Sequence, residues 1–268
     1  MGGIKRLGQH FLINRLAAKK IIDALDLQAG EMIIEIGPGR GALTIPLVRA
    51  CKAIGCRILA LEKDKTLATF LRDRSPISRD REIVEIFTGD ALKILPSLTS
   101  HLPPLTSFKL VGNIPYYITG RLLRILSELE NKPRLTVLTI QKEVAERITA
   151  KPPKMNLLSA ITQFWAEPEI IARLKPADFS PRPKVASAII KLTSRSTSNL
   201  QPLNSNFYRF VKILFKQPRK TVLNNLKAGL KISPEAVIKI LKRQGLTGKE
   251  RPQDLSLKML TVLAVSLN

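Results

Sequence analysis

Short apolar runs alternate with segments of helical periodicity along the first 192 residues. The runs are bounded by glycine or polar positions, which is typical of buried strands. The expected strands cover residues 32–36, 57–61, 83–87, 108–111, 135–140, 170–174 and 186–192. Helices are expected over residues 16–25, from about residue 42, and over residues 142–148. Strands that alternate with helices predict an α/β fold with a doubly wound, mostly parallel sheet.

The pattern changes after residue 192. Residues 193–206 are polar and uneven, which predicts a linker, and the remaining residues show only helical periodicity. We therefore expect an α/β domain over residues 1–192, a linker over 193–206 and a small all-helical domain over 207–268. The first 20 residues are basic without any acidic residue, which indicates a basic N-terminal arm before the first helix.

The charge of the chain is strongly unbalanced. Lys and Arg number 44 against 21 Asp and Glu, and the formal net charge is +23. A surplus of this size favours a nucleic acid as partner, with an anionic membrane surface as the weaker alternative. The segment from residue 191 to the end contributes 15 Lys and Arg against 3 Asp and Glu. The helical domain is therefore the expected nucleic-acid-binding part of the chain.

Cysteine and histidine are too few for most metal sites. The chain has only Cys51, Cys56, His10 and His101, and their spacing fits no metal-binding pattern. We expect no metal and interpret the two cysteines as reduced residues that pack in the core. No apolar run reaches transmembrane length and the N-terminus lacks an apolar signal core. We expect a cytoplasmic protein without a membrane partner, and a monomer by default.

The most informative stretch follows the fourth expected strand. Gly112 ends that strand, so Asn113 should lie at the carboxyl edge of the sheet, where α/β folds bind ligands. Pro115 favours an extended Ile114, whose carbonyl could turn outward beside the side-chain carbonyl of Asn113. Tyr116 could stack on a planar ligand while its hydroxyl stays solvated. Taken alone, the stretch favours the alternative of a turn beside a core tyrosine.

Two converging carbonyl oxygens suit one kind of chemistry. An exocyclic amino group such as N6 of adenine is a poor nucleophile, because its lone pair is delocalised into the ring. Acceptors that hold its hydrogens would favour a pyramidal nitrogen and direct the lone pair at an electrophile. No ionised base is then needed beforehand.

Three acidic residues accompany a glycine-rich loop at the expected strand ends. The loop, residues 37–41, follows Glu35 in the first strand, while Glu62 and Asp90 follow the next two strands. Glu35 could engage an ammonium group, directly or through water. Glu62 could accept from ribose hydroxyls and Asp90 from an adenine amine. An amine, a ribose and an adenine occur together in S-adenosylmethionine. An alternative is that a neighbouring lysine neutralises Glu62 as a surface ion pair.

These motifs resemble those of the ribosomal RNA adenine N6,N6-dimethyltransferases, in the same order and over nearly the whole chain. The small-subunit branch of the family is the most similar. His10 stands where the family often has Asn, and Pro218 replaces a basic residue next to Arg219 and Lys220. The motifs occupy residues 8–12, 35–44, 62, 89–91, 113–116, 141–145 and 179–185.

The resemblance implies a Rossmann-like class I methyltransferase sheet with S-adenosylmethionine as methyl donor. It implies dimethylation of N6 of two adjacent adenosines near the 3′ end of 16S ribosomal RNA, free or in a pre-30S particle. Alternatives are a large-subunit methyltransferase of the macrolide-resistance type, or an assembly or transcription factor that keeps the fold. The implied cofactor-binding residues are His10, Leu12, Gly37, Glu62, Asp90 and Asn113, and the implied catalytic residues are Asn113, Tyr116 and Phe179.

Phe179 has an argument of its own. It lies in a loop stiffened by prolines, residues 178–184, which combines an aromatic ring with two cations. A base drawn out of an RNA fold needs an aromatic partner, which contributes about 1–3 kcal/mol per base. The alternative is a core phenylalanine that anchors the loop. The sequence favours neither, whereas the resemblance favours stacking.

Overall fold

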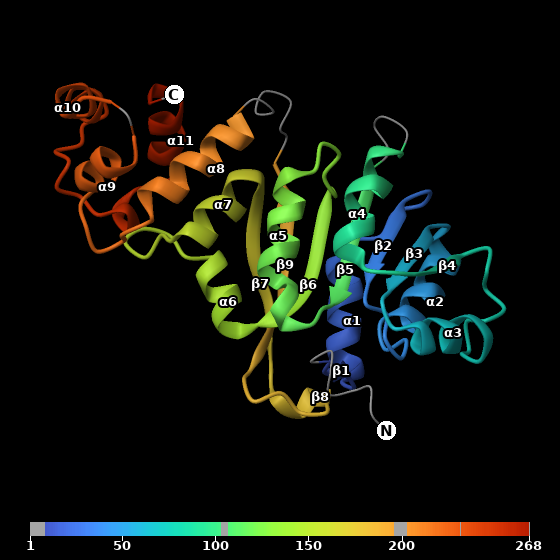
Figure 1. Ribbon diagram of the computed structural model, residues 1–268. Helices are drawn as coiled ribbons and strands as arrows, with labels where there is room; N and C mark the ends of the chain where they lie inside the picture. The colour runs from blue at the N-terminus through green and yellow to red at the C-terminus, as the bar shows by residue number, and fades with distance from the viewer. Residues whose placement is uncertain (1–8, 103–106, 196–202, 231, 268) are drawn as a thin grey trace. The chain divides into compact units, whose positions relative to one another are not determined.

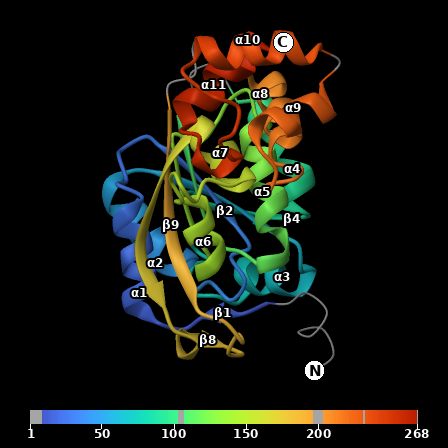
Figure 2. The same cartoon turned by 90° about the vertical axis from the view of Figure 1, so that its left-hand side faces the viewer.

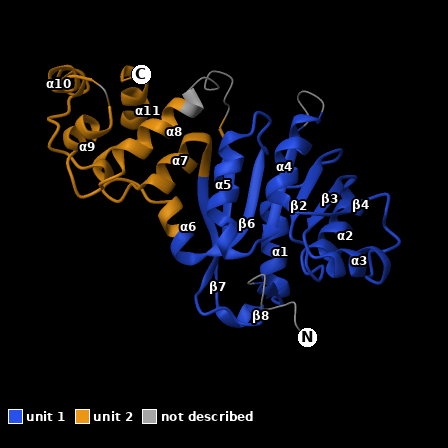
Figure 3. Cartoon of the chain, in the orientation of Figure 1, with its two compact units in different colours: residues 1–145, 168–194 blue, residues 146–167, 195–268 orange. Residues whose placement is uncertain are grey.

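The computed structural model describes residues 9–102, 107–195, 203–230 and 232–267 (Figure 1). The chain forms two compact units (Figure 3). The first, here the sheet unit, comprises residues 1–145 and 168–194. The second, here the helical unit, comprises residues 146–167 and 195–268.

The sheet unit is built on one mixed sheet, which confirms the predicted α/β fold. Its first five strands are parallel, and β9 runs antiparallel to β6. The strand order within the described residues is β4-β3-β2-β5-β6-β9-β7. The strands are β2 (Met32–Ile36), β3 (Arg57–Glu62), β4 (Val84–Thr88), β5 (Phe108–Asn113), β6 (Leu135–Gln141), β7 (Ala166–Leu174) and β9 (Ser187–Ser194). All seven predicted strands are present, with ends shifted by a few residues.

Helices cover both faces of this sheet. Figure 2 shows α1 and α2 on one face and α4 and α5 on the other. Strands covered on both faces are largely apolar, and β2 accordingly buries Ile33, Ile34 and Ile36. The helices are α1 (Arg15–Ala24), α2 (Thr44–Ile54), α3 (Lys65–Asp73), α4 (Ala91–Ser100), α5 (Thr119–Glu128) and α6 (Lys142–Ile148). None of the described helices is long and apolar enough to cross a membrane.

Polar side chains start several of these helices. The side-chain oxygen of Asn14 accepts from the N–H groups of Leu16 and Ala17 at the start of α1. Asp64 and Asp90 cap α3 and α4 in the same way. Each cap satisfies N–H groups that have no partner within the helix. The caps of α3 and α4 follow β3 and β4 directly, so these helices start at the carboxyl edge of the sheet.

A small two-stranded sheet joins the N-terminal arm to a distant loop. The strands β1 (Phe11–Leu12) and β8 (Phe179–Ser180) pair antiparallel, and Leu12 lies opposite Phe179 (Figure 1). The N–H of Ile13 also donates to the carbonyl of Asp178 over 2.8 Å. The short 3₁₀ helices η1 (Tyr116–Ile118) and η2 (Pro176–Asp178) precede α5 and β8. The predicted basic arm is thus hydrogen-bonded to the predicted proline-rich loop.

The helical unit packs around its own apolar core. Its elements are α7 (Leu157–Trp165), α8 (Leu203–Leu214), α9 (Val222–Gly229), α10 (Pro234–Arg243), η3 (Pro252–Asp254) and α11 (Leu257–Ser266). The rings of Phe164 and Phe207 stack with their centroids 3.9 Å apart. This packing draws residues 146–167 into the helical unit, which differs from the predicted boundary at residue 192.

The predicted linker is shorter in the structure, because β9 continues to Ser194 and α8 begins at Leu203. Residues 196–202 of that linker lie outside the described residues. The functional division into a cofactor-binding domain and an RNA-binding domain stays a prediction.

The two cysteines were wrongly expected to be reduced. The structure joins Cys51 and Cys56 in a disulfide with their Cα atoms 4.6 Å apart. Gly55 ends α2 in the left-handed conformation, with a φ of 88°, and turns the chain back on the helix. The N–H of Cys56 then donates to the carbonyl of Cys51, which brings the two side chains together. Both side chains are buried.

Candidate functional site

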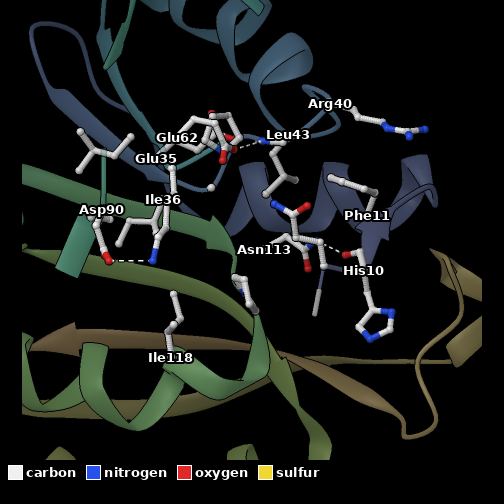
Figure 4. A pocket seen from close by; sticks show the side chains of 18 of the residues that line it. His10, Phe11, Glu35, Ile36, Arg40, Leu43, Glu62, Asp90, Asn113 and Ile118 are labelled. Carbon is white, nitrogen blue, oxygen red and sulfur yellow. Dashed lines mark hydrogen bonds and ion pairs between the residues drawn. The ribbon is translucent and has the colours of Figure 1, made fainter. Parts of the chain in front are cut away.

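A cavity lies at the carboxyl ends of β2, β3 and β5 (Figure 4). These strands are neighbours in the sheet, so the residues that end them and the loops that follow meet at one edge. All six residues predicted to bind the cofactor line this cavity, namely His10, Leu12, Gly37, Glu62, Asp90 and Asn113. The structure thus brings together positions that are up to 103 residues apart in sequence.

The glycine loop after β2 needs glycine for conformation and for space. Gly37, Gly39 and Gly41 adopt φ values of 67°, 59° and 83°, which disfavour other residues. A Cβ on Gly39 would lie 3.0 Å from the ring of Phe11. A Cβ on Gly37 would meet no atom within 4 Å, so the backbone borders open space there. A ligand can therefore approach the backbone of this loop closely.

Glu62 is buried and faces the same loop. One carboxylate oxygen accepts from the N–H of Gly39 over 2.9 Å, and the other accepts from the N–H of Asp64 over 2.8 Å. Burial raises the pKa of Glu62, and these N–H groups act against that shift. Neither Lys63 nor Lys65 forms an ion pair with Glu62 in the described structure. The surface ion pair considered from the sequence is therefore not formed, and each oxygen keeps capacity for a further donor.

Glu35 presents an acceptor without a partner. Its Oε1 accepts from the hydroxyl of Thr44 over 3.1 Å, whereas its buried Oε2 has no hydrogen-bond partner. Burial raises the pKa of Glu35 to about 8; the Thr44 bond opposes this shift and the nearby charge of Glu62 adds to it. A buried oxygen in this state would be stabilised by a donor or a cation placed in the cavity.

Asp90 has two roles at the other side of the cavity. Its Oδ1 caps α4 by accepting from the N–H of Leu92 over 3.0 Å. Its Oδ2 accepts from Nζ of Lys63, also over 3.0 Å. Burial acts to raise the pKa of Asp90, but the bonds from Lys63 and Leu92 outweigh it and the pKa lies below its ordinary value. Sequence reasoning treated Lys63 only as a partner of Glu62 and missed this pair.

Asn113 points its side chain toward the N-terminal arm and the cavity (Figure 4). Its Nδ2 donates to the backbone carbonyl of His10 over 2.8 Å. Because only the nitrogen of the amide can donate to a carbonyl, this bond identifies Oδ1 as the atom that remains to accept from a ligand. The ring of His10 is held in turn, since Nδ1 lies 2.7 Å from the carbonyl oxygen of Pro181.

Tyr116 differs from its expected arrangement. It is half-buried and does not line the cavity, while its neighbour Tyr117 does and is 62% exposed. The hydroxyl of Tyr116 was expected to be solvated; it instead lies 2.7 Å from the hydroxyl of Ser187. Its ring lies near that of His10, with the centroids 5.7 Å apart. Sequence reasoning did not single out Tyr117, which has no distinguishing spacing.

Phe179 is also placed away from the cavity. Its side chain is only 1% exposed and belongs to the core of the sheet unit, together with Leu12 and Leu174. The arrangement corresponds to the core phenylalanine that the sequence left open as an alternative. Stacking on a base would require this ring to become exposed. By contrast, the ring of Phe11 lines the cavity, beneath the guanidinium of Arg40 at 4.9 Å.

The basic segment between α8 and α9 is held by a buried side chain. The amide of Asn225 donates to the carbonyls of Gln217, Lys220 and Thr221 and accepts from the N–H of Gln217. The side chains of Arg219 and Lys220 are exposed on this loop. The described residues contain no group of three or more His, Cys, Asp or Glu arranged to hold a metal ion.

Comparison with known proteins places the chain in a family. Residues 3–263 match the family described as ribosomal RNA adenine dimethylase. The chain belongs to this family. It is therefore an rRNA methyltransferase, as the resemblance of its motifs predicted.

Its relatives include the ribosomal RNA small subunit methyltransferase A of Dehalococcoides mccartyi, 35% identical over 257 residues, which cover 95% of this chain and 84% of that protein. The protein of the same name from Acidobacterium capsulatum is 35% identical over 261 residues, covering 96% and 89% of the two chains.

Two solved structures share the Rossmann-like methyltransferase fold. The dimethyladenosine transferase from Plasmodium falciparum has a TM-score of 0.77 at 23% identity, covering 95% of this chain and 96% of that chain. The 23S rRNA methyltransferase ErmE has a TM-score of 0.73 at 24% identity, covering 96% and 99%. At these identities the likeness concerns the fold alone.

Proposed function

We propose that this protein dimethylates N6 of two adjacent adenosines near the 3′ end of 16S ribosomal RNA during ribosome biogenesis. S-adenosylmethionine would be the methyl donor. The observation that carries the proposal is the position of Asn113. Its amide nitrogen is held by His10, and its Oδ1 remains as an acceptor at the cavity that Glu62 and Asp90 also line.

The residues of the cavity fit the proposed donor. Glu35 offers a buried acceptor without a partner, which suits the ammonium group of the donor, directly or through water. Glu62 would accept from the ribose hydroxyls and Asp90 from the adenine amine. The open space beside Gly37 leaves room for a ligand against the backbone. When bound, S-adenosylmethionine would supply an electrophilic methyl group carried on a sulfonium.

The chain itself would supply orientation and not a strong base. Oδ1 of Asn113 would accept a hydrogen bond from the target amine and so favour a nitrogen whose lone pair faces the donor. Tyr116 and Phe179 are proposed to hold the target base. For Phe179 this includes a rearrangement of the loop 178–184 that exposes its ring. A site that excludes water would favour transfer, because the positive charge on sulfur disappears in the reaction.

The RNA partner is proposed to be small-subunit ribosomal RNA, free or in a pre-30S particle. The net charge of +23 supports a polyanionic substrate. Arg219 and Lys220 are exposed on a loop held by Asn225 and would contact phosphates, which position an RNA without reading its sequence. Such a substrate would place the protein in the cytoplasm, and we propose that it acts as a monomer.

The small subunit is proposed as the substrate on the basis of the relatives and not of the fold. Relatives that are 34–36% identical carry the name ribosomal RNA small subunit methyltransferase A. The fold is shared with a 23S rRNA methyltransferase and does not distinguish the two substrates.

The test is incubation of the protein with labelled donor and purified subunits that lack the modification, followed by nucleoside analysis. We expect N6,N6-dimethyladenosine in the small-subunit RNA. Label only in large-subunit RNA would favour the macrolide-resistance alternative. Binding of small subunits without consumption of donor would favour an assembly factor.

A further inference from the structure

Lys63 and Asp90 form an ion pair in the wall of the cavity. Nζ of Lys63 lies 3.0 Å from Oδ2 of Asp90, and both residues line the cavity (Figure 4, dashed line at Asp90). The side chain of Lys63 is 55% exposed and that of Asp90 is 26% exposed. Lys63 follows Glu62 directly, so the end of β3 brings it to the cavity beside the carboxylate proposed for the ribose.

The pair uses the oxygen of Asp90 that a ligand would need. Oδ1 is committed to the N–H of Leu92, which caps α4. Oδ2 is therefore the better placed acceptor for an amine in the cavity, and it already accepts from Lys63. A purine amine that binds Asp90 must share this oxygen with the ammonium group or displace it.

Displacing Lys63 from Asp90 costs little free energy, because the side chain of Lys63 is largely in solvent. Exposed ion pairs contribute little to stability, since water solvates both charges. Besides Asp90, the charged or titratable groups that act on Lys63 are Tyr117 and Arg121. The cation of Arg121 repels Lys63. Neither Tyr117 nor Arg121 is a carboxylate, so neither competes with Asp90 for the ammonium group of Lys63. Lys63 can thus stay beside the purine as a donor.

We propose that Lys63 is a specificity-determining residue for the purine of the methyl donor, an inference that rests on the proposed function of this cavity. The edge of the cavity then offers an acceptor, Asp90, next to a donor, Lys63. A 6-amino purine would bind Asp90 against competition from Lys63. The oxygen of a 6-oxo purine would accept a hydrogen bond from Lys63, and Lys63 would keep its ion pair with Asp90. Lys63 therefore lowers the ratio by which the cavity prefers a 6-amino purine over a 6-oxo purine.

The test measures binding and not activity. Dissociation constants of S-adenosylhomocysteine and of its 6-oxo analogue, S-inosylhomocysteine, are determined by calorimetry for the parent protein, Lys63→Met and the control Lys65→Met. Lys65 is exposed on α3 and does not line the cavity. From the strength of exposed ion pairs we expect Lys63→Met to bind the adenosine ligand about threefold more tightly and the inosine ligand about threefold more weakly. The preference for the amino form would rise about tenfold, and Lys65→Met would match the parent.

Lys63→Gln serves as a second variant, because it keeps a donor without the charge. Its preference for the adenosine ligand over the inosine ligand should lie between those of the parent and Lys63→Met. In a background with Asp90→Asn, Lys63→Met should no longer tighten binding of the adenosine ligand, since the competing ion pair is already removed, but it should still weaken binding of the inosine ligand. An unchanged preference in Lys63→Met would overturn the inference while leaving the proposed function intact. If neither thioether bound the parent protein, the proposed function would fail as well, so the two failures are distinguishable.

Discussion

The side-chain nitrogen of Asn113 donates to the backbone carbonyl of His10 over 2.8 Å. The residue that ends β5 is thereby held by the residue that precedes β1. The bond commits the amide nitrogen to His10 and so fixes the orientation of the amide. An acceptor held in this way would lower the entropy that must be lost on the way to the proposed transition state.

Asn113→Ala should lower the rate of methyl transfer about 100-fold, the size of loss expected when a reacting group is misplaced. RNA binding should change little, because phosphate contacts elsewhere dominate affinity. Asn113→Asp keeps an acceptor but loses the donor to His10, so an intermediate rate is expected. Single-turnover transfer and filter binding measure the two effects. Asn224→Ala, an exposed change on α9, is the control. A rate for Asn113→Ala equal to that of the parent would contradict the assigned role.

Phe179→Leu separates packing from base stacking. Leucine fills most of the buried volume, so the free energy of unfolding should fall by less than about 1.5 kcal/mol. A leucine cannot stack on a base, and the loss of stacking predicts transfer slowed by about tenfold or more. Urea unfolding and transfer kinetics are the two measurements. Full activity in the leucine variant would show that the ring serves only the core in which it lies.

Glu35 should make the ligand-free protein less stable as pH rises. Its pKa is about 8 in the folded protein against an ordinary value of 4.5. Between these pH values the unfolded chain holds fewer protons than the folded one at this residue, so its contribution to stability falls as pH increases. Glu35→Gln removes that loss.

The melting temperature of Glu35→Gln should exceed that of the parent by a growing margin from pH 4.5 to 8 and reach a difference of a few degrees. Glu85→Gln, exposed on β4, is the control and should follow the parent. Parallel profiles for the parent and Glu35→Gln would mean that Glu35 is ionised in the folded protein.

A buried ion pair lies at the amino ends of the strands. Nζ of Lys109 is 2.6 Å from a carboxylate oxygen of Glu31, and both side chains are buried. Lys109→Met would leave the Glu31 charge buried and should lower the free energy of unfolding by about 3 kcal/mol. Arg134 also approaches Glu31, at 3.5 Å, but is 59% exposed. Arg134→Met should therefore cost less than about 1 kcal/mol. Urea unfolding of the two variants compares these costs directly, and equal losses would refute the distinction.

Reduction of the Cys51–Cys56 disulfide should destabilise the sheet unit. The bond closes a short loop, with a sequence separation of 5. In the chain-entropy model a loop of this size contributes about 2 kcal/mol. The parent protein should lose this stability in dithiothreitol, whereas a double Cys→Ser variant should not respond. A thiol count in denaturant without reductant gives an independent check. Two reactive thiols per chain would show that the disulfide is not formed in solution.

The sequence predicted which residues line the cavity better than it predicted the side-chain partners of those residues. Glu62, Asp90 and Asn113 could be placed together because each ends or follows a strand, and parallel strands bring those ends to one edge. Side-chain partners depend on packing and were not predictable in this way. The pairing of Lys63 with Asp90, the bond from Tyr116 to Ser187 and the burial of Phe179 in the core arise from contacts between distant segments. None of them leaves a periodic or spaced signal.

The same holds for the domain boundary and for Lys109. Residues 146–167 follow strand β6 in sequence, but the ring of Phe164 stacks on that of Phe207, so this segment packs in the helical unit. Lys109 interrupts an apolar strand, and its ammonium group is held there by the carboxylate of Glu31 and the backbone carbonyl of Asp26, contacts that the pattern of the strand does not predict.

The pairing of β1 with β8 links residues that are more than 160 apart, and His10 stands directly before that pairing. Trimming the chain from its N-terminus would thus do more than remove positive charge. Once the cut passed His10, Asn113 would lose the carbonyl that orients it, and the loop carrying Phe179 would lose its hydrogen-bonded neighbour. The arm would then be part of the proposed reaction centre, and a shortened protein should lose methyl transfer before it loses RNA binding.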